Sequence, residues 1–199
     1  MEDQLLNQKD AQGRKQGLWM EVEFGARKEG RYVDGFRQGV WKWYDAYGTV
    51  FKEATYNGGL LHGLWKKYRP VDGTLKEEGH YLNDKMHGIW KEYYKDGVTL
   101  YSEGPYLNDT RQGVWKWYWS NGILSEEGHY LNDTRQGVWK VYHSDGTLLK
   151  EVRYLDGDRH GVSKGYRSDG TLKWCCLYHN DEEKTESPLI LIIDWFNLI

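Results

Sequence analysis

The residues that could do acid–base or metal chemistry recur at regular places along the chain and do not gather in one cluster. His62, His87 and His160 each precede a glycine, whereas His80 and His129 each precede a tyrosine at a strand end. These histidines belong to neighbouring copies of a repeated sequence unit. Such copies are expected to lie two strands apart, roughly 10 Å, which is too far for shared metal ligation. Carboxylates that act as acid and base need unlike environments, and repeated positions provide like ones. We therefore predict no catalytic residue, no metal and no cofactor.

Three Asn-Asp pairs raise the alternative of a ladder of calcium ligands: Asn83-Asp84, Asn108-Asp109 and Asn132-Asp133. Turn chemistry explains them better, because Asn and Asp side chains bond to the backbone of tight turns and tolerate positive φ. No glycine-rich loop follows a strand and opens a helix, so nucleotide binding is not supported.

All of these residues are positioned by a unit that appears about seven times. Its opening glycines are spaced 22 to 25 residues apart: Gly17, Gly39, Gly63, Gly88, Gly113, Gly137 and Gly161. The string YLNDTRQGVWK occurs at 106–116 and again at 130–140. A fixed period in this range is the signature of a repeat architecture.

Each repeat reads as one β-hairpin. The first run, 114–119, is aromatic and β-branched, which suits a strand. Asn121-Gly122 then predicts a two-residue type I′ turn, and a second extended run covers 123–131. We therefore predict an all-β fold, an elongated single-layer antiparallel β-meander of about seven hairpin repeats with a short apolar C-terminal cap.

The turn fixes the cross-strand register of the hairpin. It places three tryptophans on one face, with these partners: Trp115 with Gly128, Trp117 with Glu126, and Trp119 with Leu124. Trp115 is expected to cover Gly128, because a large ring shields a strand residue that has no side chain. A Lys–Glu pair recurs on the opposite face, as in Lys42 with Glu53, and we interpret these carboxylates as structural.

The chain has 199 residues and divides into three regions. Residues 1–16 read as a polar N-terminal lead-in, 17–179 as the repeat domain, and 180–199 as a linker with an apolar capping segment. The last eleven residues, LILIIDWFNLI, are far short of the ~20 needed to span a bilayer. They are expected to shield the last sheet edge, with docking onto the aromatic face or onto a partner as the alternative.

Composition narrows the class of partner and the compartment. The net charge of −3 argues against a nucleic-acid binder, which would need a basic stripe. The two cysteines, Cys175 and Cys176, are adjacent and cannot join distant segments, which indicates a reducing compartment. Residues 1–16 lack the apolar run of a signal peptide, so we expect a cytoplasmic protein.

The variation between copies is the most informative feature. Scaffold positions should be uniform, so positions that differ on the Trp side of the sheet are candidates for specificity. The predicted partner-binding residues are Trp43, Asp45, Lys67, Arg69, Glu92, Tyr94, Trp117, Trp119, Val141 and His143. Tyr, Trp and Arg are enriched in protein interfaces. The tryptophans could instead only cover a sheet that has no second layer, and the two roles are compatible.

The unit G-[VIL]-W-K-x-Y-x-x-[DN]-G-x-L-x-x-E-G-x-Y resembles the MORN repeat, and more closely the bacterial variant of the YwqK-type antitoxin family. Its matching positions in one copy are Gly113, Trp115, Tyr118, Gly122, Glu127, Gly128 and Tyr130, and the resemblance covers roughly 17–179. It implies a twisted single-layer meander without shared catalytic residues. The bacterial branch implies an antitoxin or immunity protein, and the eukaryotic relatives imply scaffolds linked to membranes.

Two functions follow as hypotheses. The first is a non-enzymatic antitoxin that binds and occludes a cognate protein toxin encoded next door. The second is a structural scaffold or a self-associating module, with association at membranes as one form of it. An enzyme would need a pocket that combines several repeats. Neither nucleic acid nor a membrane is the expected partner, and the oligomeric state is left open.

Overall fold

The computed structural model describes residues 6–184, and all regular structure there is β-strand. It divides into two compact units, each described by itself: unit 1 comprises residues 6–100 and 106–109, and unit 2 comprises 101–105 and 110–184. Within the described residues no helix is long and apolar enough to cross a membrane.

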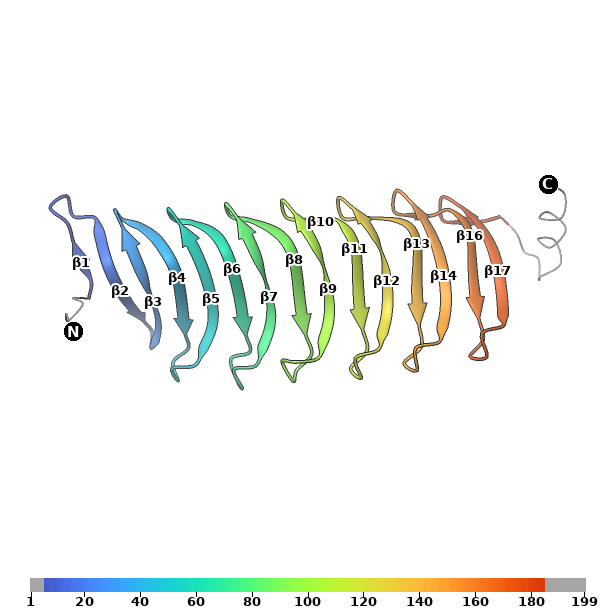
Figure 1. The fold of residues 1–199 in the computed structure, drawn as a ribbon, viewed down its shortest axis with the longest axis horizontal. Helices are drawn as coiled ribbons and strands as arrows, with labels where there is room; N and C mark the ends of the chain where they lie inside the picture. The colour runs from blue at the N-terminus through green and yellow to red at the C-terminus, as the bar shows by residue number, and fades with distance from the viewer. Residues whose placement is uncertain (1–5, 185–199) are drawn as a thin grey trace. The chain divides into compact units, whose positions relative to one another are not determined.

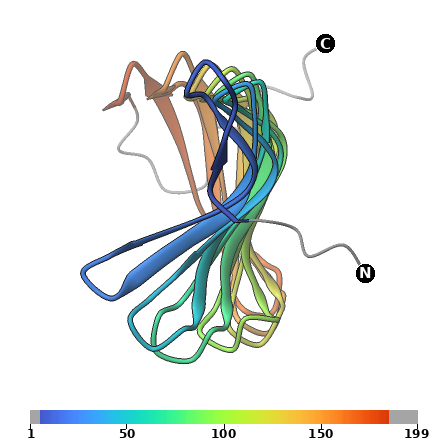
Figure 2. The same ribbon diagram turned by 90° about the vertical axis from the view of Figure 1, so that its left-hand side faces the viewer.

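Unit 1 is an antiparallel meander in which successive strands from β2 onward pair with their neighbours in sequence (Figure 1). Its strands are β1 (Gln8–Lys9), β2 (Lys15–Glu23), β3 (Ala26–Val33), β4 (Phe36–Tyr44), β5 (Val50–Asn57), β6 (Leu60–Tyr68), β7 (Leu75–Leu82) and β8 (Lys85–Tyr93). Figure 2 shows these strands, blue to green, as one layer in which each strand is bent along its length.

Unit 2 repeats the same scheme. Its strands are β10 (Thr110–Arg111), β11 (Gly113–Tyr118), β12 (Leu124–Leu131), β13 (Thr134–Tyr142), β14 (Leu148–Leu155), β15 (Asp158–Arg159), β16 (Gly161–Tyr166), β17 (Leu172–His179) and β18 (Glu182–Glu183). Strand β9 (Leu100–Leu107) has residues in both units. The predicted all-β meander of hairpin repeats is confirmed within each unit, and the predicted cap at 189–199 lies outside the described residues.

The hairpin turn at Asn121-Gly122 differs from the prediction. The Gly122 N–H donates to Trp119 O at 2.8 Å, and the Trp119 N–H donates to Ile123 O at 2.7 Å. Gly122 has a φ of 82°, which makes a three-residue loop with a G1 bulge. The dipeptide Asn-Gly is favourable both in this three-residue loop and in a type I′ turn, so it does not distinguish the two. The register therefore slips after Trp117, Tyr118 pairs with Leu124, and the predicted pairing of Trp119 with Leu124 is wrong.

The two-residue turns with positive φ at both positions lie at the other end of the hairpins. Asn132 and Asp133 have φ values of 49° and 63°, and Leu131 pairs with Thr134 across them. The Asn-Asp pairs are therefore turn residues, as the turn interpretation predicted, and type I′ geometry belongs to them.

The N-terminal boundary of the sheet also differs from the prediction. Gln8 and Lys9 form β1, in which Gln8 pairs with Gln16 of β2. Asp10 closes the connecting turn, because its Oδ1 accepts hydrogen bonds from the backbone N–H groups of Gln12 and Arg14 at 3.0 and 2.9 Å. The described part of the lead-in thus adds a short strand to β2, since the Asp10 side chain supplies a turn that hydrophobic patterning does not reveal.

In four of the described hairpins the core is a tryptophan laid over a glycine of the preceding hairpin. Trp115 pairs in register with Gly128, as predicted, but its ring covers Gly104, where a Cβ would lie 2.2 Å from the indole. The ring over Gly128 is that of Trp139, at 2.1 Å from such a Cβ. The expected cover of Gly128 by Trp115 is wrong because the rings lean toward the preceding hairpin. This lean lets the Trp115 Nε1–H donate to Pro105 O at 3.1 Å.

One repeat shows that the glycine and the ring depend on each other. The copy that follows Val152 carries Ser163 in place of the tryptophan, and Ser163 is fully buried. Val152 stands at the position that Gly128 occupies one repeat earlier, and it pairs in register with Trp139 just as Gly128 pairs with Trp115. Val152, which is larger than glycine, thus stands at a position over which no tryptophan ring packs, because Ser163 replaces that tryptophan.

The opposite face carries a ladder of tyrosine–glutamate hydrogen bonds. In six repeats the Tyr hydroxyl donates to a Glu fifteen residues earlier, as in Tyr118 to Glu103 at 2.8 Å and Tyr142 to Glu127 at 3.0 Å. Lys42 also pairs with Glu53 at 3.1 Å, as predicted. The Tyr–Glu bonds connect each of these hairpins to the one before it, whereas the Lys42–Glu53 pair joins the two strands of one hairpin. Both contacts give the repeated carboxylates a structural role.

The ladder predicts a loss of stability at alkaline pH. Burial, followed by the hydrogen bond to Glu103, raises the pKa of Tyr118 from its ordinary value of 10.0 to about 12. A raised folded pKa means that this contribution is complete below pH 10 and is lost as the pH rises toward 12. Urea unfolding of the wild type should show this fall, and Tyr118→Phe should show a smaller one.

At neutral pH Tyr118→Phe should lower the free energy of unfolding by about 1 kcal/mol, because Glu103 loses a donor. The control is Tyr47→Phe, since Tyr47 is 95% exposed. Equal alkaline losses in the wild type and in Tyr118→Phe would show that this hydroxyl makes no such contribution.

Candidate partner-binding surface

The Trp face is defined here as the sheet face that carries Trp41 in unit 1 and Trp139 in unit 2. Two residues along from these tryptophans, a row of side chains crosses each unit in cross-strand register, and we name it the variable row. In unit 1 it consists of Glu21, Lys28, Trp43, Lys52, Lys67, Glu77 and Glu92. In unit 2 it consists of Ser102, Trp117, Glu126, Val141, Lys150, Gly165 and Trp174.

Five of the predicted residues lie in this row, three in unit 1 and two in unit 2: Trp43, Lys67, Glu92, Trp117 and Val141. Their row neighbours on the second strand of each hairpin were not predicted, Lys52 among them. The signal for them was present, because the expected register already placed such residues opposite the variable positions, as Glu126 stands opposite Trp117.

The two predicted tryptophans of the row, Trp43 and Trp117, are partly structural. Trp117 lies 5.7 Å from Trp139, between ring centroids, and 6.3 Å from Tyr130. Trp43 lies 6.3 Å from both Trp41 and Tyr56. Both are half-buried. They cover the core and also leave part of each ring at the surface, so the two roles considered for them coexist.

The other five predicted residues begin the hairpin loops, and the backbone N–H of each donates across its loop. Asp45 Oδ1 accepts hydrogen bonds from the N–H groups of Tyr47 and Thr49, both at 2.9 Å, so its carboxylate closes the loop. Tyr94 and His143 begin the corresponding loops of two other hairpins, with their N–H groups donating to Thr99 O and Thr147 O.

Arg69 and Trp119 reach across to the next hairpin. Arg69 donates to Leu75 O at 2.9 Å and to Tyr93 O at 2.7 Å. The Trp119 Nε1–H donates to Tyr142 O at 3.2 Å, while the side chain stays 40% exposed. Both positions therefore connect neighbouring hairpins, and Trp119 also presents a ring to solvent.

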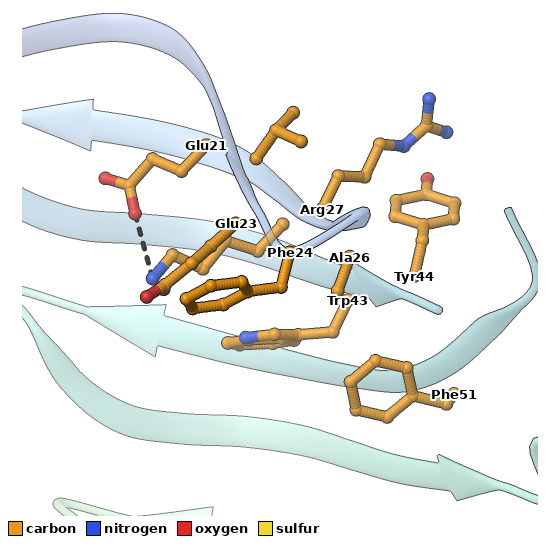
Figure 3. A pocket seen from close by; sticks show the side chains of 10 residues that line it. Glu21, Glu23, Phe24, Ala26, Arg27, Trp43, Tyr44 and Phe51 are labelled. Carbon is orange, nitrogen blue, oxygen red and sulfur yellow. Dashed lines mark ion pairs between the residues drawn. The ribbon is translucent and has the colours of Figure 1, made fainter. Parts of the chain in front are cut away.

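A pocket of about 540 Å³ opens beside Trp43 in unit 1. Its apolar lining includes Phe24, Trp43 and Phe51, which come from the β2–β3 turn, β4 and β5 (Figure 3). Glu21 lies at its edge and pairs with Lys28 at 2.9 Å. The pocket therefore joins an aromatic wall to charged residues of the variable row.

Cations gather around the same tryptophan. Lys52 Nζ lies 4.5 Å from the centre of the Trp43 ring, and the Arg37 guanidinium lies 5.7 Å from it. Burial, and then repulsion from Arg37 and Lys67, lowers the pKa of the Lys52 ammonium. This part of the face is therefore positive and incompletely solvated.

Residues 6–184 contain no group of three or more His, Cys, Asp or Glu side chains that could hold a metal ion. Cys175 and Cys176 are free and half-buried within this range.

Comparison with known proteins bears on this repeat directly. Four segments match the MORN repeat variant. They cover residues 37–57, 86–108, 111–132 and 135–156. MORN repeats are in general non-catalytic modules that bind proteins or membranes. No curated protein matches the chain. The matched segments include Trp43 in unit 1 and Trp117 and Val141 in unit 2, so part of the variable row lies on hairpins that match this repeat in each unit.

Proposed function

We propose that this chain is an antitoxin or immunity protein that binds a cognate protein toxin through the Trp face and blocks the toxin's active site. The observation that carries the proposal is the variable row. Its members stand in cross-strand register and differ in charge and size from one hairpin to the next, whereas the Trp–Gly and Tyr–Glu contacts around them repeat. The repeated Trp–Gly and Tyr–Glu contacts form a common structural frame. The side chains of the variable row differ from one hairpin to the next on that frame, so they can select one partner.

The energetics of such a surface favour tight binding. Its aromatic rings are held by neighbouring rings, so binding orders few side chains and loses little conformational entropy. Charges of both signs along the row also restrict which partner surface fits, because a like charge placed opposite costs affinity. Occlusion needs only a rigid complementary surface and no reaction by this chain.

Trp119 gives the clearest single test of the ring contacts. Trp119→Ala is expected to weaken toxin binding at least tenfold, because exposed tryptophans at interface centres are common hot spots. Trp119→Phe keeps an aromatic ring but loses the hydrogen bond to Tyr142 O, so it controls for the structural role. Isothermal titration should find Trp119→Phe within about threefold of the wild type. Equal weakening by both variants would assign the effect to the frame.

The function itself is tested by co-expression with the product of the adjacent open reading frame. The proposal expects that product to arrest growth alone and to be rescued by this chain, with a one-to-one complex on gel filtration. Absence of both rescue and complex would contradict it. Large assemblies of the chain alone, measured by light scattering, would favour the scaffold function.

A further inference from the structure

Phe24 is an aromatic residue in an unfavourable backbone conformation, and burial of its ring does not compensate for that conformation. Its φ is 49°, and every other non-glycine residue with positive φ within 6–184 is Asn or Asp. This region costs an ordinary L-residue roughly 1–2 kcal/mol. The Phe24 side chain is 98% exposed, so the fold gains nothing from the ring. Strain kept without a structural return is typical of functional positions.

The Phe24 ring stands at the mouth of the pocket already described. Trp43 and Phe51 line the pocket with it, and Figure 3 shows the Trp43 ring between the rings of Phe24 and Phe51 in this view. A volume of about 540 Å³ can take a large apolar side chain together with part of a backbone. The pocket therefore has room for one anchoring side chain of a partner.

The cations beside this pocket have no acidic partner in the described chain. The groups that influence Arg37 are Tyr32 and Tyr56, and those that influence Lys52 are Arg37 and Lys67. Neither cation forms an ion pair with a carboxylate within residues 6–184. Two positive groups thus lie against the Trp43 ring with their charge uncompensated.

Unit 2 has the same arrangement with its charge neutralised. Arg135 occupies the position of Arg37, since it lies 4.1 Å from the Trp139 ring and bonds to Tyr154 as Arg37 bonds to Tyr56. There Glu126 pairs with Arg135 at 3.3 Å. The residue of unit 1 that corresponds to Glu126 is Lys28. The frame therefore accepts an internal carboxylate at this site, and unit 1 lacks it.

We propose that this surface of unit 1 binds an acidic protein segment, whose carboxylates pair with Lys52 and Arg37 and whose apolar side chain enters the pocket of Phe24, Trp43 and Phe51. The inference rests on the proposed function and names the chemistry of the partner. Charge complementarity selects a carboxylate, as the Glu126–Arg135 pair does in unit 2. Glu21 and Glu23 line one edge of the pocket, so the segment must present its apolar side chain there and its carboxylates to Lys52 and Arg37. A membrane or a nucleic acid is disfavoured, because an extended polyanion would cover the whole row and also meet Glu77 and Glu92.

The test is a titration of the full-length, ¹⁵N-labelled chain with an acetylated Glu-Trp-Glu-Glu peptide amide, followed by NMR. The expected result is a salt-sensitive shift of the Trp43 indole signal. Lys52→Gln should weaken binding at least threefold, and Phe24→Ala should weaken it too. The matched control is Lys150→Gln, because Lys150 holds the same register position in unit 2, and it should leave binding unchanged.

Three results would overturn the inference: equal binding of a Lys-Trp-Lys-Lys peptide, equal weakening by Lys150→Gln, or tighter binding of phosphatidylserine vesicles or inorganic phosphate at Trp43. Its failure can be told from failure of the proposed function. If the adjacent gene product is bound equally well by Lys52→Gln, only this inference falls. If no toxin is bound or neutralised while the peptide still binds at Trp43, the antitoxin function falls.

Discussion

Trp139→Ala is expected to lower the free energy of unfolding by about 3–5 kcal/mol, the range for a large aromatic side chain deleted from a packed core. Trp139 is 1% exposed, and its ring centroid lies 4.9 Å from Tyr130 and 6.2 Å from Tyr154. Its removal uncovers Gly128 and opens a cavity between two hairpins. The measurement is urea unfolding, with amide exchange in β12 to β14 to locate the loss.

The control for Trp139→Ala is Trp119→Ala, which truncates the same residue type where the ring is 40% exposed. That loss should be near 1 kcal/mol, the worth of one hydrogen bond and partial burial. Losses of equal size in the two variants would contradict a core built on the Trp–Gly contact.

Gly128→Val is expected to lower the free energy of unfolding by about 3 kcal/mol or more, because overpacking forces a close-packed core to shift. A Cβ on Gly128 would lie 2.1 Å from Trp139, so the ring must leave its place. Adding Trp139→Ser removes the clash and reproduces the combination of Val152 with Ser163. The double variant should then lose less than the sum of the single losses, by roughly 1–3 kcal/mol.

The matched control for this double-variant cycle is Gly122→Val combined with Trp139→Ser. Gly122 has positive φ and no atom within 4 Å of its would-be Cβ, so its valine variant is strained but does not touch the ring. Those two losses should add. Additive losses for Gly128→Val and Trp139→Ser as well would show that the ring and the glycine are independent.

The repeat and most of the register could be predicted from the sequence, and the contacts between hairpins could not. Val114 pairs with His129 and Lys116 with Glu127 because hydrophobic alternation and the turn dictate pairing inside one hairpin. The lean of Trp115 toward Gly104 depends on how neighbouring hairpins twist relative to each other. The spacing of residues within one repeat does not encode that twist.

Two structural features have a signal in the sequence that the predictions did not use. The Tyr–Glu ladder has a constant separation of fifteen residues, as between Glu103 and Tyr118. The loop at Asn121-Gly122 was misassigned because one dipeptide serves two turn types, and the length of the flanking strands decides between them. Of the candidate site, the row positions followed from copy-to-copy variation. The exposed Phe24 did not, because exposure and backbone conformation appear only in the fold.

The central claim is that a partner binds the variable row of the Trp face, and two valines of β13 test it most directly. Val141 lies in the row, whereas Val138 is 46% exposed on the opposite face of the same strand. Each is replaced by glutamate, folding is checked by thermal unfolding, and affinity for the adjacent gene product is measured by titration calorimetry. The account predicts at least a tenfold loss for Val141→Glu and none for Val138→Glu. A loss confined to Val138→Glu would place the partner on the other face.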